Sequence, residues 1–519
     1  MSNKIYRKAI ATALATTFAL SGAMPAIAAE PVVKGPESVQ DWYDAGQNFV
    51  RLSRHLAHDQ HHQHRAKNVI FFVGDGMGIS TLTAARILEG QLNGKPGEEN
   101  RLSFEKFPNV ALSKTYSWDQ QTSDSAPTMT AMITGYKARE GMLSVNHLTA
   151  RGECDAAKTA ANALPTLLEQ AAAAGKSTGV VSTARLTHAT PAATYAHTAV
   201  RDWEHNGQVA AACAGVANPV KDIARQLIEV SPAVKASLKV AMGGGREYFR
   251  NNTQADPEYT TKKGQRTDGR DLTAEWVSTR GAKAAFAWNK AQFDAVDPNT
   301  TNYLLGLFER SHMQYEADRA TDTGGEPSLT EMTEKSINML KKDRQGFFLH
   351  VESGRIDHAH HAGNAQRALL DTIELAKAVK KAYEMTDPRE TLIVVTADHS
   401  HVFTIAGYPH RGNNILGLAK EVPAVDGTAP TPTKAGDGLP YTTLGYQNGP
   451  GAVSGARADL TSVDTTALGY MQQAVVPMGS ETHAGEDVAI YATGPRANLF
   501  RGSMEQNWIY HVMKEAFGF

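Results

Sequence analysis

Six short apolar runs constrain the fold of this chain more than any other feature of its 519 residues. Each run is continuously apolar instead of alternating, which is typical of strands buried on both faces of a parallel sheet. The predicted strands are residues 69–73, 177–181, 239–242, 346–351, 391–396 and 487–492. Helical patterns between the runs predict helices at residues 80–89, 164–174, 329–340 and 366–383. We therefore expect an α/β fold with a mostly parallel central sheet flanked by helices.

The composition excludes two classes of protein. The chain carries 52 Lys and Arg against 54 Asp and Glu, a net charge of -2. A nucleic-acid binder needs clustered cations, and the chain has no long basic block, so no nucleic-acid partner is expected. Two cysteines are too few for a disulfide scaffold or a thiolate-rich metal site. The 19 histidines are the one unusual feature of the composition.

The first 29 residues have the three parts of a secretory signal peptide. A basic start at residues 1–8 is followed by an uncharged run rich in Ala, Thr and Leu, and then by small residues before Glu30. The alternative is a membrane-anchoring helix, but the run is short and rich in alanine for a span that needs about 20 strongly apolar residues. We expect residues 1–29 to be cleaved and the mature protein to be periplasmic or secreted.

No later apolar run reaches membrane-spanning length, and the C-terminus lacks the hydrophobic tail of a lipid-anchor signal, so no membrane anchor is expected. Cys154 and Cys213 then lie in an oxidising compartment. A structural bridge between them is favoured over a reactive thiol in such a compartment.

Three of the predicted strands lead to an acidic residue: Asp75, Glu352 and Asp398. In open α/β sheets, ligands bind beyond the carboxyl ends of the strands. One such acid is often only the N-cap of the next helix, but three are harder to explain in that way. If they are adjacent, they cannot all be ionised without a compensating charge. A metal site is therefore predicted at this edge, with His399 directly after Asp398.

The sequence RIDHAHH at residues 355–361 strengthens the metal prediction. Asp357 and His361 are four residues apart and would face the same way on a helix. A carboxylate and an imidazole at this spacing form a reasonable zinc half-site, whereas the alternative is a solvated polar helix face. Because the motif closely follows an acid-tipped strand, metal ligation is favoured.

A candidate nucleophile, Ser125, precedes Ala126, Pro127 and a helix-like run. It would lie at a helix N-terminus, where free N–H groups and the helix dipole favour negative charge. The alternative is that Ser125 is only the N-cap, and the two interpretations are compatible. A serine needs a base or a metal to become a useful nucleophile. No GxSxG motif surrounds Ser125, so metal activation is favoured over a Ser-His-Asp triad.

Six motifs, in order along the chain, resemble those of the alkaline phosphatase family. They are VGDGMG (73–78), TSDSAPTMTAMITG (122–135), HATPAATYAHTAVR (188–201), VESGRIDHAHH (351–361), TADHSH (396–401) and ETHAGEDVAIYATGP (481–495). The resemblance runs from about residue 38 to the C-terminus, and segments such as MGGGREYF make it closest to the animal-type members. It implies metal-dependent hydrolysis of phosphate monoesters to alcohol and inorganic phosphate through a phosphoserine on Ser125.

The resemblance also implies a set of metal ligands and a phosphate-binding residue. One zinc ion would be held by Asp357, His361 and His483, and a second by Asp75, Asp398, His399 and the Ser125 oxygen. A magnesium ion would be held by Asp75, Thr190 and Glu352, an all-oxygen set that suits a hard cation. Arg201 matches the family's phosphate-binding arginine, whose planar fork can hold two phosphoryl oxygens. His483 is assigned on the resemblance alone, and His358 is expected beside the magnesium site.

Animal-type members also have a calcium site, and Glu258, the Phe308 carbonyl and Glu309 fall on its pattern. The last carboxylate would be Glu326, which stands where the family has an aspartate. The surrounding residues 321–327 carry a small insertion. The resemblance therefore implies two Zn2+, one Mg2+ and, at this altered pattern, one Ca2+.

The expected organisation has four parts. They are the signal peptide at 1–29, an N-terminal arm at 30–66, a catalytic α/β domain at 67–403 and 480–519, and an insertion at 404–479. The insertion is rich in Gly, Pro, Thr and Ser, which indicates a separate subdomain, and it resembles the family's crown. Because the arm and the crown contact the partner subunit in the family, the resemblance implies a homodimer.

The arm contains a histidine-rich tract made of His55, His58, His61, His62 and His64. Such a tract can bind metal, so local zinc capture is one hypothesis, and a solvated loop is the alternative. Three alternatives to phosphate monoester hydrolysis are left open for the whole chain. They are a phosphodiesterase or a sulfatase of the same superfamily, and a non-catalytic extracytoplasmic metal-binding protein.

Overall fold

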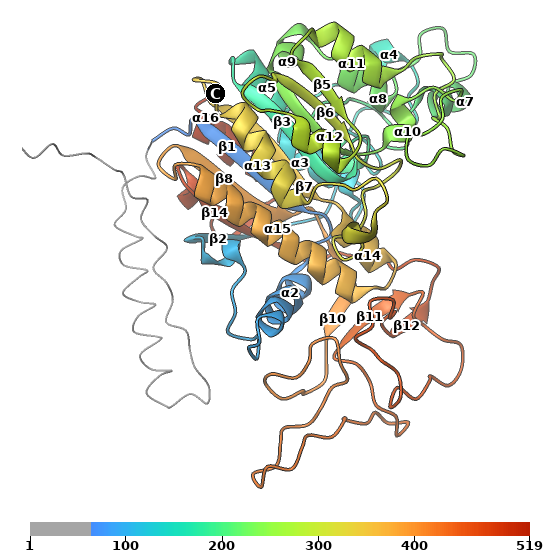
Figure 1. Ribbon diagram of the computed structural model, residues 1–519, viewed down its shortest axis with the longest axis vertical. Coiled ribbons are helices and arrows are strands. Elements are labelled where there is room, and N and C mark those ends of the chain that lie inside the picture. The colour runs from blue at the N-terminus through green and yellow to red at the C-terminus, as the bar shows by residue number, and fades with distance from the viewer. Residues whose placement is uncertain (1–63) are drawn as a thin grey trace, which may run out of the picture. The chain divides into compact units, whose positions relative to one another are not determined.

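The computed structural model describes residues 64–519, so the predicted signal peptide and nearly all of the arm lie outside the described residues. The described chain is built on a ten-stranded sheet with the order β15-β2-β14-β8-β1-β7-β3-β4-β6-β5. The bounds are β1 (Asn68–Gly74), β2 (Asn109–Lys114), β3 (Ser177–Arg185), β4 (Leu238–Gly244), β5 (Ala284–Ala287), β6 (Tyr303–Leu307), β7 (Phe347–Ser353), β8 (Thr391–Ala397), β14 (Val488–Thr493) and β15 (Ser503–Glu505). Helices lie on both sides of this sheet (Figure 1).

Neighbouring strands are parallel except at β14, which is antiparallel to both β8 and β2. The predicted α/β fold with a mostly parallel sheet is confirmed. The expectation that residues 487–492 form a parallel strand is wrong. A continuously apolar run indicates that both faces of a strand are buried, but it does not indicate whether the strand is parallel or antiparallel to its neighbours. The sequence did not indicate β2, β5, β6 or β15, which are the two outermost strands at each edge of the sheet.

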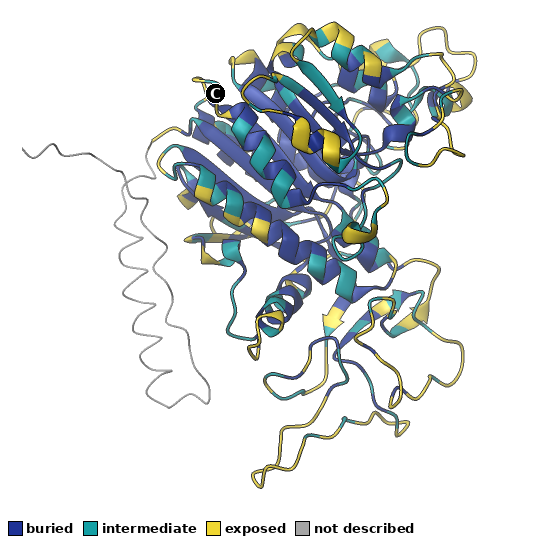
Figure 2. Ribbon diagram, in the orientation of Figure 1, coloured by how far each residue is buried: buried dark blue, intermediate teal, exposed yellow. Residues whose placement is uncertain are grey.

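Two apolar cores hold the sheet, one on each face. Along β1, Ile70 and Phe72 pack into one core, whereas Phe71 and Val73 pack into the other. The first core contains residues of α2 (Ile79–Leu92), α13 (Leu329–Leu340) and α15 (Ala365–Met385). The second contains residues of α3 (Ser125–Thr134), α5 (Leu167–Ala173) and α16 (Trp508–Phe517). The central strands are buried along their length (Figure 2), so the side chains at their carboxyl ends stand on a rigid frame.

The four predicted helices are present as α2, α5, α13 and α15. α5 begins at Leu167 and not at residue 164, because Thr166 caps it in a reciprocal pair of hydrogen bonds with Glu169. Besides α3 and α16, the described residues also form the α-helices α4 (Ala156–Ala161), α6 (Ala189–Ala192), α7 (Asn206–Ala212), α8 (Ile223–Ile228), α9 (Pro232–Ser237), α10 (Arg246–Phe249), α11 (Leu272–Arg280), α12 (Lys290–Ala295) and α14 (Arg355–His361).

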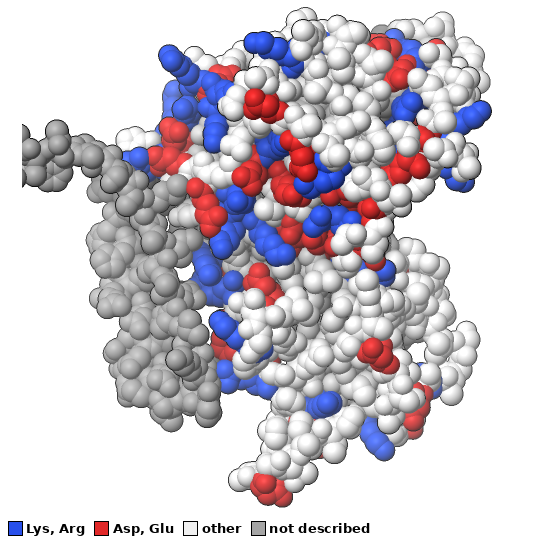
Figure 3. Space-filling view, viewed as in Figure 1, with Lys and Arg blue, Asp and Glu red and all other residues white. Residues whose placement is uncertain are grey.

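A second, three-stranded sheet lies apart from the main one. It consists of β10 (Phe403–Ile405), β11 (Leu444–Gly449) and β12 (Ala474–Pro477), with long loops between them (Figure 1). On the face shown in Figure 3, charges of both signs are mixed over α13 and α15, whereas the loops around the small sheet carry few charges. Two further short strands, β9 (Ser400–His401) and β13 (His483–Ala484), pair with each other.

Cys154 and Cys213 form a disulfide with Cα atoms 5.5 Å apart, which confirms the predicted bridge. It lies in a small apolar cluster with Trp203, Val209 and Val220, separate from the two main cores. Within residues 64–519, no helix is both long enough and apolar enough to cross a membrane.

One buried polar side chain of the sheet is poorly matched by hydrogen bonds. His350, in the middle of β7, is 0% exposed, and among the described residues its ring nitrogens make no hydrogen bond of regular geometry, only an approach to the Phe71 backbone. Burial lowers the pKa of His350 to about 3. The imidazole is therefore neutral in the folded protein, and its unmatched polar atoms destabilise the core.

We predict that His350→Leu raises the free energy of unfolding by about 1–3 kcal/mol at neutral pH, because leucine removes the unpaired polar atoms. Below pH about 6.5 the unfolded imidazole binds a proton that the folded one does not, so the wild type loses up to about 1.4 kcal/mol per pH unit down to about pH 3. The advantage of the variant should therefore grow as the pH falls through this window. Thermal unfolding of both proteins with saturating metals at several pH values measures it; a difference that does not change with pH would contradict the assignment.

Candidate active site

The three strands that lead to acidic residues are neighbours in the sheet, in the order β8-β1-β7. Their register aligns the last residues of all three strands. Asp398 and Asp75 directly follow β8 and β1, and Glu352 is the last residue but one of β7. All three carboxylates are 0% exposed. The sheet therefore brings together the three acids that the sequence analysis singled out.

A first cluster forms where α14 meets β13. The Asp357 Oδ1 atom is 3.3 Å from His361 Nε2 and 3.3 Å from His483 Nε2, and the two imidazole nitrogens are 3.2 Å apart. A tetrahedral zinc ion with bonds of about 2.0–2.1 Å keeps its ligands about 3.3 Å apart. The three side chains therefore stand at the mutual spacing that one such ion needs.

A second cluster forms at the ends of β1 and β8 and the start of α3. His399 Nε2 is 3.3 Å from Asp75 Oδ1, 3.4 Å from Asp398 Oδ2 and 3.1 Å from Ser125 Oγ. Ser125 Oγ lies 3.3 Å from Asp75 Oδ1. These distances again fit the ligand spacing of a tetrahedral ion. The cluster joins the nucleophile candidate to its predicted ligands.

A third group of oxygens lies beside the second cluster. Asp75 Oδ2, Thr190 Oγ1 on α6 and Glu352 Oε1 are buried, and within residues 64–519 none of them has a hydrogen bond of regular geometry, although Thr190 approaches the Glu352 carboxylate. Asp75 and Glu352 also belong to a compact group with His188. Buried oxygens are normally paired, so oxygens without donors fit a bound cation. An all-oxygen set suits Mg2+, the ion predicted for these residues.

The charges of the site depend on each other. Burial, followed by the charges of Asp398 and Asp357, raises the pKa of Asp75 well above its ordinary value. Burial, together with the nearby charge of Asp398, raises the pKa of Glu352 to about 8. Burial opposes protonation of His399, but Asp398 and Asp75 raise its pKa to about 10. Without cations the site would therefore hold protons at neutral pH, and cations would replace them.

Ser125 is the first residue of α3, and its N-cap is Asp124, whose side chain accepts a hydrogen bond from the Ala126 N–H. The alternative in which Ser125 is itself the N-cap is wrong, because the chain places an aspartate one residue earlier. Asp124 also pairs with the Arg201 guanidinium, whose other nitrogen lies 2.8 Å from His188 Nε2. Arg201 is thus held by Asp124, the residue that directly precedes the nucleophile candidate Ser125 in the sequence. His358 lies with its ring centroid 5.3 Å from that of His188, beside the Glu352 group.

The sequence analysis missed two residues of the site, His401 and Glu481. His401 Nε2 is 2.8 Å from Asp357 Oδ1, and His401 Nδ1 is 2.6 Å from Glu481 Oε2. Both residues belong to compact groups that could hold a metal ion. The pairing of His401 with His483 in β9 and β13 brings them there. The second histidine of TADHSH was the only available signal, and nothing local distinguished it from a surface histidine.

Two of the predicted calcium ligands, Phe308 and Glu309, directly follow the carboxyl end of β6. Glu258 and Glu309 form a compact group with Asp322, a residue of the insertion that had not been assigned. Burial, followed by the charge of Asp322, raises the pKa of Glu326 to about 9, and Glu326 Oε2 has no hydrogen-bond partner in the described part of the chain. Phe308 directly precedes Glu309 and is 1% exposed. The structure therefore offers two carboxylates, Asp322 and Glu326, where the pattern needs one.

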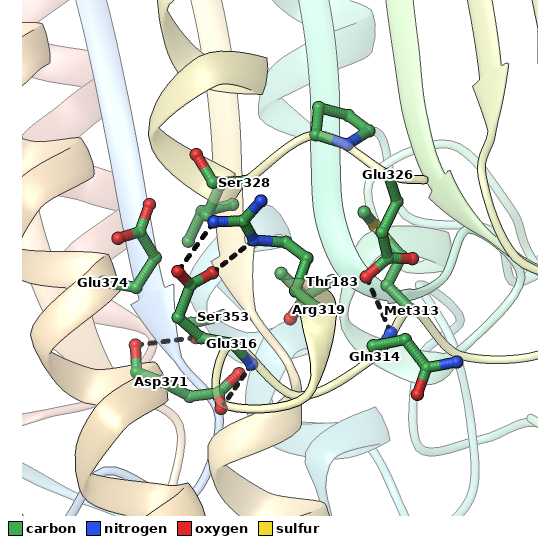
Figure 4. Close-up of a pocket in the computed structure, with 12 residues that line it drawn as sticks. Thr183, Met313, Gln314, Glu316, Arg319, Glu326, Ser328, Ser353, Asp371 and Glu374 are labelled. Atoms are coloured by element: carbon green, nitrogen blue, oxygen red, sulfur yellow. Dashed lines mark hydrogen bonds and ion pairs between the residues drawn. The ribbon is translucent and has the colours of Figure 1, made fainter. Parts of the chain in front are cut away.

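Glu326 also borders a small pocket between the insertion and α15 (Figure 4). The Gln314 N–H donates to Glu326 Oε1 at 2.9 Å, and Arg319 pairs with Glu316 across the pocket. Burial raises the pKa of Asp371, on the α15 wall, to about 8. Glu326 of the insertion is therefore held at the border of this pocket by the Gln314 backbone.

The profile of the alkaline phosphatase family matches residues 66–519. The chain belongs to the alkaline phosphatase family. It is 44% identical over 491 residues to the tissue-nonspecific alkaline phosphatase of Gallus gallus, covering 93% of this chain and 90% of that protein. It is 47% identical over 458 residues to the isozyme of Mus musculus, covering 87% of this chain and 83% of that protein.

The solved structures agree on the fold of this alkaline phosphatase. The enzyme of Thermus thermophilus superposes with a TM-score of 0.60 at 22% identity, covering 88% of this chain and 92% of that one. Family membership makes the protein a metal-dependent hydrolase of phosphate monoesters. It thereby decides against the alternatives of a diesterase, a sulfatase and a non-catalytic metal binder.

We predict that removing bivalent cations from the phosphatase lowers its thermal unfolding midpoint, because the buried carboxylates lose their compensating charge. An ion at a thousand-fold excess over its dissociation constant stabilises the folded state by about 4 kcal/mol. Adding Zn2+ and Mg2+ back at neutral pH should release protons, since Asp75 and Glu352 have raised pKa values. Calorimetry in two buffers of different ionisation enthalpy measures this release. An unchanged unfolding midpoint after chelation would contradict the prediction.

Proposed function

We propose that the enzyme transfers the phosphoryl group of its substrate to Ser125 and then to water. The supporting observation is that Ser125 Oγ lies 3.1 Å from His399 Nε2 and 3.3 Å from Asp75 Oδ1, within a ligand set of tetrahedral spacing. The hydroxyl also stands at the N-terminus of α3, where the helix favours negative charge. A serine in this position can act as nucleophile and hold a phosphoryl group afterwards.

The metal assignment follows the donor atoms. The imidazole-containing clusters would hold two Zn2+: Asp357, His361 and His483 in one, and Asp75, Asp398, His399 and Ser125 in the other. The oxygens of Asp75, Thr190 and Glu352 would hold Mg2+. When bound, these ions lower the pKa of hydroxyl groups and stabilise negative charge on the transferring phosphoryl group. Glu258, the Phe308 carbonyl, Glu309 and either Glu326 or Asp322 would hold Ca2+.

Side chains of the protein would bind the phosphate and position the groups that act on it. Arg201 would bind two phosphoryl oxygens, because its guanidinium is planar and is held by Asp124 and His188. Asp124 caps α3 and also positions Arg201, so one carboxylate fixes both the nucleophile's helix and the phosphate-binding group. His401 would orient Asp357, since it hydrogen-bonds that carboxylate and is itself held by Glu481.

We also infer the organisation and location of the protein. Residues 67–403 and 480–519 would be the catalytic domain, and 404–479 the crown of a homodimer. Apolar residues of the crown support a partner surface: Val475, on the edge strand β12, is 77% exposed and Met478 is 43% exposed. The disulfide agrees with a periplasmic or secreted protein.

We predict that Ser125→Ala lowers kcat for an aryl phosphate by several powers of ten, because the covalent route is lost. The neighbouring buried Ser123→Ala is the matched control, since its hydroxyl only bonds the adjacent Asp124 carbonyl. The wild type, quenched in acid after mixing with substrate, should carry phosphate on Ser125 by mass spectrometry. Near-native turnover by Ser125→Ala with full metal loading would rule out the phosphoserine.

For the calcium site, we predict that Asp322→Asn weakens Ca2+ binding about ten-fold or more, because it removes one charge from the compact group with Glu258 and Glu309. Glu326→Gln is the matched variant, and the larger of the two losses identifies the main ligand. The rise of the unfolding midpoint with added Ca2+ measures both. If neither variant changes that rise, calcium does not bind there.

A further inference from the structure

An exposed aromatic pair stands on the segment that leads to the nucleophile. The Trp118 and His147 rings are stacked, with centroids 3.7 Å apart and planes inclined by 16°. Trp118 is 53% exposed, and neither residue belongs to the described apolar cores. Neither the fold nor the proposed chemistry uses this pair. A stacked, half-exposed tryptophan is a ready surface for a second flat ring.

The topology places this segment at the catalytic edge of the sheet. β2 and β8 are each antiparallel to β14, so they run in the same direction. The chain therefore leaves β2 at the edge where Asp75, Glu352 and Asp398 lie. It passes through Trp118 and reaches Ser125 seven residues later.

Hydrogen bonds tie the aromatic pair to the phosphate-binding residue. The Trp118 N–H donates to the Ala138 carbonyl at 3.0 Å, and the Glu140 N–H donates to Asp119 Oδ1 at 2.9 Å. The Arg201 N–H donates to the Gly141 carbonyl at 2.7 Å. The loop that supports Trp118 is thus also the loop that holds the Arg201 backbone. The position of Trp118 is therefore linked to that of Arg201 through the backbone of residues 138–141.

We propose that Trp118, backed by His147, is a stacking platform for the base of a nucleoside monophosphate whose phosphate occupies the Arg201 and Ser125 site. In such a substrate the ribose separates the base from the buried phosphate, so the base emerges at the rim. An aliphatic phosphate has no ring to stack there. The platform therefore sets a preference among leaving groups, and this proposal rests on the proposed phosphoryl transfer at the Ser125 and Arg201 site.

The test compares AMP with glycerol phosphate on the metal-loaded enzyme. Stacking of a base on an aromatic side chain is worth roughly ten-fold or more in affinity. Trp118→Ala should therefore lower kcat/KM for AMP about ten-fold, mainly through KM, and leave glycerol phosphate within about two-fold. Trp118→Phe should retain most of the AMP activity. Tyr136→Ala, which removes another exposed aromatic residue, is the matched control and should change neither substrate.

Three results would overturn the platform. The first is an unchanged kcat/KM for AMP in Trp118→Ala, and the second is an equal loss of kcat/KM for both substrates. The third is a sedimentation coefficient of Trp118→Ala that differs from that of the wild type, because it would assign Trp118 to a subunit interface. Failure of the proposed phosphoryl transfer to Ser125 looks different, because Ser125→Ala would then keep near-native turnover of both phosphates. Turnover of glycerol phosphate by Ser125→Ala and by the Trp118 variants therefore separates the two cases.

Discussion

Burial of like charges at the end of three adjacent strands is the constraint on which this site depends. Asp75, Glu352 and Asp398 are fully removed from solvent within one edge of the sheet. Carboxylates about 4 Å apart repel each other by about 4 kcal/mol at an effective dielectric constant of about 20, and burial adds to the cost. The two apolar cores prevent the strands from separating to relieve this repulsion. The fold therefore requires bound cations to compensate these carboxylates, and the same cations are available for catalysis.

The central part of the fold and of the site could be predicted from local sequence. Apolar runs identified β1, β3, β4, β7 and β8, and the acids at their ends identified the metal edge. The spacing of Asp357 and His361 indicated a shared helix face, and α14 contains both. These predictions succeeded because strand burial, helix periodicity and the position of strand ends are all encoded within about ten residues.

The rest depends on contacts that no local pattern encodes. β14 is as apolar as its neighbours but runs in the opposite direction, which leaves His483 before its strand and not after it. His483 then reaches the site only through the two-residue pairing of β13 with β9. The same pairing brings His401 and Glu481 to Asp357. Asp322 likewise joins Glu258 through the fold of an inserted segment, where the sequence alone assigned the last carboxylate to Glu326.

The two imidazole-containing clusters of the site differ in their exposure to solvent. Asp75, Asp398 and His399 are completely buried, whereas the side chains of His361 and His483 are 31% and 15% exposed. Solvent and a departing alcohol can therefore reach the Asp357 cluster more easily than the Ser125 cluster. Because Ser125 belongs to the buried cluster, the proposed in-line attack from its oxygen would drive the leaving group toward the open one. Water that enters from the open side would then approach the proposed phosphoserine from the direction opposite to Ser125. The arrangement of buried and exposed ligands thus suits both halves of the proposed two-step hydrolysis.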